Sequence, residues 1–163
     1  MISGDDDRRA QIADFGIARI VGVVGFTTLT NRNFRFVAPE LMPIYPSSQP
    51  IRPTFKSDIY SLALLFLQVS MNLLQTITDS FPFDKLFHGP DSSTRGLPYN
   101  HIPNDAALVK EIHRGGRPRR ERYNSISDHH WALMEWCWSC HPDARPSITE
   151  VRHALSGLAE QAS

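Results

Sequence analysis

Cysteine is scarce in this chain, and its scarcity excludes a fold stapled by disulfides. The 163 residues contain 2 cysteines, Cys137 and Cys140. Small secreted domains use several disulfides to compensate for a small core, so two thiols this close together indicate a reduced, cytoplasmic protein. The first residues contain neither a basic segment nor an apolar run of the kind that forms a secretory signal, which favours the same location.

Long apolar runs and a net charge are also missing. The longest pure apolar run, residues 62–67, is far shorter than the roughly 20 residues that cross a bilayer, so we expect no membrane segment. The basic and acidic residues number 17 each, and a neutral chain has no overall attraction to nucleic acid or to an anionic membrane. With 41% hydrophobic residues, the composition is that of one globular domain.

What is present predicts a mainly α domain. Residues 10–13 suggest a short strand, and residues 55–71 are so apolar that the pattern predicts a helix buried on all sides. The Pro- and Gly-rich stretch 76–103 predicts a long irregular loop. The last three helices are expected within 104–161.

Helix-capping residues place the starts of those three helices. Asn104 and Ser127 can each cap a helix, and Ser147 with Glu150 forms a capping box. The apolar stripe of the last helix consists of Ile148, Val151, Leu155 and Leu158.

Four motifs, in order along the chain, resemble those of the protein kinase family. They are Asp14-Phe15-Gly16, Ala38-Pro39-Glu40, Ser57-Asp58-Ile59-Tyr60-Ser61, and Cys137-Trp138 followed by Pro142 and Arg145-Pro146. One Asp-Phe-Gly is weak on its own, but four motifs at kinase-like separations are strong and cover nearly the whole chain. The ending and the Arg-Phe-Val-Ala-Pro-Glu stretch are similar to those of the tyrosine-kinase-like and tyrosine kinase groups.

The resemblance implies a fold and its parts. Residues 1–163 would form a partial protein kinase domain, a kinase-like C-lobe with a short β-hairpin remnant at the N-terminus, truncated before the Asp-Phe-Gly segment. Residues 14–40 would be the activation segment, and residues 55–71 the central helix F of the lobe.

The resemblance also implies a nucleotide and metal site. Asp14 would hold Mg²⁺ against the phosphates of ATP, with Phe15 and Gly16 beside it, because a carboxylate is the hard oxygen ligand that this ion prefers. Thr27, Thr28 and Thr30 lie within the activation segment. A phosphate on one of them would be paired by Arg32 or Arg35, although plain loop residues are the simpler interpretation.

Three further residues are expected to have structural roles. Glu40 and Arg145 correspond to residues that form a buried ion pair in kinases, which fixes the end of the activation segment to the last helices. Asp58 corresponds to a carboxylate that accepts hydrogen bonds from the catalytic loop. Without that loop, Asp58 must face water or another donor.

The chain lacks other parts of a kinase site. It contains no glycine-rich loop, no strand lysine and no His-Arg-Asp catalytic loop, so we expect no catalytic base and no phosphotransfer by this chain alone. Asn33 replaces a threonine that touches the catalytic loop in many kinases, and Ala63 replaces a glycine usual in helix F. The leading hypothesis is a fragment of an ATP- and Mg²⁺-dependent protein kinase acting on Ser, Thr or Tyr.

Alternative interpretations remain open. One is a non-catalytic pseudokinase or interaction module whose partner surfaces lie around residues 76–122. Cys137, Cys140 and His141 match the haem-attachment pattern C-x-x-C-H, and the two thiols with a histidine could hold zinc. The basic run 114–120 could contact nucleic acid, although it lacks interleaved aromatic residues and a solvated linker is favoured. We therefore expect protein partners, including a chaperone or the missing lobe, and no nucleic acid or membrane.

Overall fold

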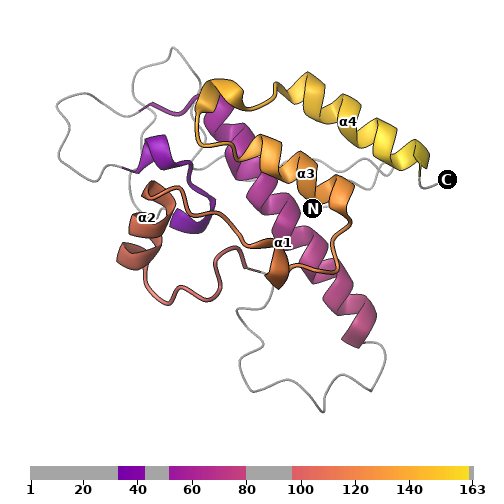
Figure 1. The fold of residues 1–163 in the computed structure, drawn as a ribbon, viewed down its shortest axis with the longest axis horizontal. Coiled ribbons are helices and arrows are strands. Elements are labelled where there is room, and N and C mark those ends of the chain that lie inside the picture. Colours follow the sequence, from indigo (N-terminus) through magenta and orange to yellow (C-terminus); the bar gives the residue numbers. More distant parts are fainter. Residues whose placement is uncertain (1–32, 43–51, 80–96, 162–163) are drawn as a thin grey trace, which may run out of the picture. The chain divides into compact units, whose positions relative to one another are not determined.

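The computed structural model describes residues 33–42, 52–79 and 97–161 (Figure 1). Every regular element in these ranges is helical, as the predicted mainly α class requires. The β-hairpin remnant expected near the N-terminus lies outside the described residues.

Four α-helices and four short 3₁₀ helices make up the described part. In chain order they are η1 (Phe34–Phe36), η2 (Pro39–Leu41), α1 (Phe55–Asp79), α2 (Asp105–His113), η5 (Arg120–Arg122), α3 (Asp128–Cys137), η6 (Pro142–Ala144) and α4 (Ile148–Gln161). The longest, α1, continues past Met71 to Asp79, into residues expected to be loop. No Pro or Gly interrupts the sequence before Pro82, so nothing local ends the helix earlier.

The start of α1 is fixed by reciprocal capping. The Ser57 backbone N–H donates to Thr54 Oγ1 at 3.1 Å, and the Thr54 backbone N–H donates to Ser57 Oγ at 2.9 Å. The Ser57 hydroxyl also donates to the Thr54 carbonyl at 2.7 Å. These bonds satisfy backbone groups that a helix start leaves unpaired, and Ser57 is fully buried.

One face of α1 forms the centre of the core. Figure 1 shows α1 with α3 beside it, and α1 also contacts η1 and η6. The buried side chains recur every three or four residues, which places them on one face. They are Ile59, Tyr60, Ala63, Leu64 and Leu67.

The opposite face of α1 is apolar and uncovered. Leu65 is 48% exposed, and Val69 and Leu73 are also exposed. The expectation of a helix buried on all sides is wrong, because the described elements that pack on α1 cover only one side of it. We call Asp58, Leu65, Val69 and Leu73 the uncovered face; helical spacing places them on one stripe.

By length and composition alone, residues 55–74 of α1 would suffice to cross a membrane. The core helix of a globular domain passes the same test. The packing of α1 against α3 and η1 accounts for the apolar side chains on its buried face.

The other helices begin at the residues that the sequence predicts. Asn104 Oδ1 accepts from the Ala107 N–H at 2.8 Å, and Ser127 Oγ accepts from the His130 N–H at 3.4 Å. In the capping box of α4, the Glu150 carboxylate accepts from the Ser147 N–H at 2.7 Å.

The end of α2 is set by two glycines. Gly115 has a φ of 88°, a left-handed conformation that favours glycine. Its N–H donates to the Ile112 carbonyl at 3.0 Å, and the Gly116 N–H donates to the backbone carbonyl of Glu111 at 2.9 Å, as in a Schellman cap.

Aromatic rings connect α3 to the preceding segment. Trp131 stacks on Tyr123 with ring centroids 5.8 Å apart and meets Trp138 edge-on at 5.4 Å. From α4, Val151 is buried, whereas Ile148 is 61% exposed and does not extend the predicted stripe. Ile148 is the first residue of its helix, and that first turn leaves it outside the core.

Candidate functional site

An ion pair between a buried arginine and a partly exposed glutamate joins two segments that lie far apart in the sequence. Arg145 Nη1 and Nη2 donate to the two carboxylate oxygens of Glu40 at 2.6 and 2.9 Å. The Arg145 side chain is fully buried, and that of Glu40 is 29% exposed. The structure thus brings together the two residues for which the sequence predicts this pair.

The remaining donors of Arg145 bind backbone carbonyls. Nη1 donates to the Lys56 carbonyl and Nε to the Ser139 carbonyl, each at 2.9 Å. Lys56 Nζ donates in return to the Arg145 carbonyl. The guanidinium of Arg145 thus connects η2, the start of α1 and the α3–α4 connection. These hydrogen bonds also satisfy its buried charge.

Two arginines lie against the ring of Tyr60 of α1. The guanidinium carbons of Arg145 and Arg117 lie 5.0 and 5.3 Å from the centroid of its ring. The Tyr60 and Tyr99 hydroxyls are 3.4 Å apart, and the Tyr99 hydroxyl donates to the Gly116 carbonyl at 3.3 Å. Burial raises the pKa of the Tyr60 hydroxyl, so it stays protonated. The two cations stack on a neutral ring.

Arg35 fixes η1 to the segment before α2. Its Nη1 donates to the Pro98 and Tyr99 carbonyls at 3.0 and 2.7 Å, and its Nη2 donates to Ile102 at 2.9 Å. Tyr99 has a φ of 55°, which is unfavourable for a bulky residue, and these bonds help to hold it there. Arg35 was a candidate partner for a phosphothreonine, but in this structure its guanidinium is already bound to carbonyls.

The basic run 114–120 is divided by the fold. Arg117, expected in a solvated linker, donates to the Trp138 and Gly116 carbonyls at 2.9 and 2.8 Å. Arg120 donates to the Ile126 carbonyl at 2.5 Å and to Asp128 at 2.8 Å. Arg114 and Arg119 are exposed. Two of the four arginines in the run are therefore bound to groups within the fold. The other two are too few for a continuous nucleic-acid surface.

Asp58 lies at the start of the uncovered face of α1. Its side chain is exposed, and no donor among the described residues reaches its carboxylate. Partial burial of the carboxyl group raises its pKa. The described part of the chain thus leaves this carboxylate without the partner that the kinase resemblance implies.

The two thiols have different surroundings. Cys137 is buried and Cys140 is exposed, and both are free. Burial raises the pKa of the Cys137 thiol to about 11, which opposes the thiolate form that zinc requires. Within the described ranges, no three His, Cys, Asp or Glu side chains gather where they could hold a metal ion.

Other predicted site residues are only partly placed. Asn33 is exposed, and its Oδ1 accepts from the Arg35 N–H at 3.3 Å, which caps η1. The proposed nucleotide and metal residues, Asp14, Phe15 and Gly16, lie outside the described residues, and so do Thr27, Thr28 and Thr30.

Sequence reasoning missed the stacking role of Tyr60 and Arg117. The signal was weak, since the linker Gly115-Gly116-Arg117-Pro118 does not indicate which ring its arginine will meet.

Comparison with known proteins gives one family. The family described as protein tyrosine and serine/threonine kinase matches residues 3–155. Serine/threonine-protein kinase STY17 of Arabidopsis thaliana is 24% identical over 156 residues, which cover 94% of this chain and 22% of that protein. Serine/threonine-protein kinase STY46 of the same plant is 21% identical over 159 residues, with 96% and 22% covered. The dual serine/threonine and tyrosine protein kinase of Apis mellifera is 26% identical over 158 residues, with 97% and 14% covered. The chain thus spans about a fifth or less of the length of these relatives.

Proposed function

This chain belongs to the protein tyrosine and serine/threonine kinase family, and from that premise we propose that it is the C-lobe part of a kinase domain. Its role in that domain is to hold the end of the activation segment, residues 14–40, in place. The complete domain would transfer phosphate from ATP, with Mg²⁺, to Ser, Thr or Tyr of a protein. This chain alone does not catalyse the transfer.

The observation that carries this proposal is the uncovered face of α1. An exposed stripe of large apolar side chains beside an unpartnered carboxylate is unusual for an isolated domain. In a kinase domain, the corresponding aspartate accepts hydrogen bonds from the catalytic loop. The positions of Asp58, Leu65 and Val69 support the proposal that further kinase segments pack on this side of α1.

The described residues do not by themselves fit ATP or Mg²⁺. They contain no cluster of His, Cys, Asp or Glu suited to a metal ion. Asp14, with Phe15 and Gly16, remains the proposed metal and nucleotide contact, on the strength of the motif alone. No catalytic step is therefore assigned to the described residues, whose proposed roles are positional.

Glu40 and Arg145 are the proposed structural anchor. The bidentate geometry and the burial of Arg145 support this role, because a charge-assisted pair with good geometry defines register as well as adding energy. Asp58 is the proposed acceptor for the absent catalytic loop. Phosphorylation at Thr27, Thr28 or Thr30 remains a proposal, for which Arg32 is the better partner because Arg35 is occupied.

A second candidate is a non-catalytic interaction module. Asn33 favours it, because this residue replaces a threonine that contacts the catalytic loop and its side chain is used to cap η1. In either case the proposed partners are proteins: a substrate, a regulator, the missing lobe or a chaperone. The free thiols in the described part support a cytoplasmic location.

Labelled ATP and a generic protein substrate test the proposal. We expect background transfer from the purified chain, because it has neither the catalytic base nor the strand lysine that position the reactants in a kinase site. Transfer that persists through purification and disappears in Asp14→Ala would contradict it. If the gene encodes a glycine-rich loop and His-Arg-Asp upstream, the longer product should be active; inactivity of that product would favour the interaction module.

A further inference from the structure

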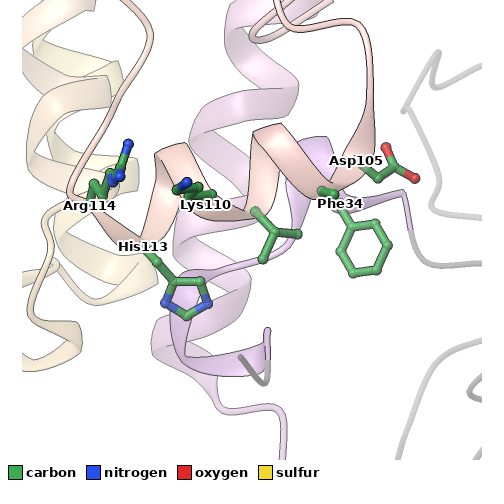
Figure 2. A pocket seen from close by; sticks show the side chains of 7 residues that line it. Phe34, Asp105, Lys110, His113 and Arg114 are labelled. Atoms are coloured by element: carbon green, nitrogen blue, oxygen red, sulfur yellow. The ribbon is translucent and has the colours of Figure 1, made fainter. Parts of the chain in front are cut away.

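A groove runs along α2 beside η1. Its volume is about 660 Å³, and its lining residues are Phe34, Asp105, Ala106, Val109, Lys110, His113 and Arg114. Figure 2 shows the rings of Phe34 and His113 on the same side of α2. Positions 106, 109, 110 and 113 recur at helical spacing, so they form one face of α2, whereas Leu108 and Ile112 are buried in the core.

Two lining residues, Phe34 and His113, belong to segments that are fixed to the rest of the fold. Phe34 lies beside Arg35, whose guanidinium binds the carbonyls of residues 98, 99 and 102 just before α2. His113 Nε2 donates to the Met42 carbonyl at 2.8 Å, which joins the end of α2 to the residue after η2. A ligand therefore meets a formed surface and pays little ordering entropy in the protein.

The floor and one end of the groove differ in chemistry. Phe34, Ala106 and Val109 supply an apolar floor. Lys110 and Arg114 supply two positive charges toward the C-terminal end of α2, and neither has an ion-pair partner among the described residues. At the other end stands Asp105, in the first turn of α2.

The length of the groove suits a polypeptide. From Asp105 to Arg114 the helix rises by about 14 Å, which is the span of about four residues of an extended chain. Two cations are too few for a nucleic-acid backbone. An apolar floor followed by cations complements an apolar side chain followed by an acidic one.

We propose that this groove binds a segment of a partner protein that places an apolar side chain on Phe34, Ala106 and Val109 and an Asp or Glu, two or three residues away, against Lys110 and Arg114. The binding itself does not depend on catalysis. That the partner is a substrate or regulator of a kinase domain rests on the function proposed above.

Two neighbouring alanines provide the test. Ala106 and Ala107 are both exposed on α2, but only Ala106 lines the groove. Ala106→Trp fills the groove, and Ala107→Trp is its matched control for helix stability and added apolar surface. A third variant, Lys110→Glu with Arg114→Glu, reverses the charge, and Arg152→Glu on the exposed surface of α4 is its control.

The probe is a phage-displayed library of random 12-residue peptides, panned on the full chain after counter-selection on Ala106→Trp. We expect peptides with an apolar residue and an Asp or Glu at that spacing. In fluorescence polarisation, synthetic copies should lose about tenfold or more in affinity for Ala106→Trp and for the charge-reversed protein. Ala107→Trp and Arg152→Glu should bind like the unaltered chain, and all variants should melt within a few degrees of it.

Two results would overturn the proposal. One is enrichment of peptides without acidic residues. The other is peptides that bind Ala106→Trp as tightly as the unaltered chain, which would indicate adsorption to the uncovered face of α1. Neither outcome depends on phosphotransfer, so the proposed function is judged separately by the ATP assay.

Discussion

The two faces of α1 are similar in composition and opposite in environment. Leu64 and Leu67 are fully buried against η1 and α3, whereas Leu65 and Val69, on the same turns, are exposed. The carboxylates beside them differ in the same way. Glu40 pairs with buried Arg145 on the packed side, and Asp58 on the uncovered side has no donor among the described residues.

This difference shows what the apolar content of a helix determines and what it does not. Burial of either face lowers the free energy by a similar amount per unit of area. Which face is buried is decided by segments distant in sequence, here residues 33–42 and the stretch from 99 to 158. The uncovered face is also apolar, but no described segment packs on it. This is the basis for proposing that further kinase segments pack there.

The largest effect is expected from removing Glu40. Glu40→Ala leaves the fully buried Arg145 guanidinium without its counter-ion, which should lower the free energy of unfolding by about 3–5 kcal/mol. Asp58→Ala is the matched control on the uncovered side. It should change the free energy of unfolding by less than about 1 kcal/mol, because the exposed Asp58 carboxylate has no donor among the described residues. Chemical denaturation of both variants measures the difference, and equal losses would contradict the contrast between the two sides.

A similar contrast is expected for two adjacent leucines. Leu64→Ala creates a cavity in the packed core and should lower the free energy of unfolding by about 2–5 kcal/mol. Leu65→Ala should change it by less than about 1 kcal/mol, because this side chain is 48% exposed. A loss from Leu65→Ala as large as that from Leu64→Ala would mean that both faces are packed.

The sequence predicts much of the fold because its signals are local. Capping by Asn104, Ser127 and Ser147 depends on hydrogen bonds within three residues, and the helices begin there. The Glu40–Arg145 contact is a different case. It follows from family resemblance, since no local signal joins residues 105 positions apart.

The parts that the sequence did not predict depend on long-range packing. Periodicity alone could not distinguish a helix buried all round from one with a single partner layer, so the hydrophobic pattern did not predict the exposure of Leu65 and Val69. Arg35 and Arg117 looked like free surface cations. Their roles emerge only where folding brings the carbonyls of Tyr99 and Trp138 within reach. The groove beside α2 likewise needs Phe34 next to a helix that begins at Asp105.

Charge on the uncovered face should improve solution behaviour with little change in stability. Leu65→Glu with Val69→Glu replaces two exposed apolar side chains, so the free energy of unfolding should change by only about 1 kcal/mol or less. Fluorescence of a hydrophobic dye and self-association in sedimentation velocity should both fall. Unchanged dye binding and a monomeric unaltered chain would show that this face is not the adhesive surface.

The smallest expected effect is on the stability of the fold at alkaline pH, through the buried Cys137 thiol on the packed side. An unfolded cysteine ionises near pH 8.5, whereas burial raises the pKa of the Cys137 thiol to about 11. The folded state therefore holds its proton longer, and this contribution to stability is complete below about pH 8.5 and is lost as pH rises toward 11. Cys137→Ala should show a shallower decline in melting temperature over that range. Parallel declines would contradict burial of the thiol.

The most direct test of the account is the accessibility of neighbouring positions on the two faces of α1. Leu64→Cys and Leu65→Cys, each with Cys140→Ser, are labelled with a maleimide at pH 7, and buried Cys137 provides an internal reference. The account predicts that the thiol at position 65 reacts at least about a hundredfold faster than the one at position 64, an opening free energy of about 2.7 kcal/mol or more. Equal protection at both positions would show that the second face is already covered and would remove the basis for seating further kinase segments on it.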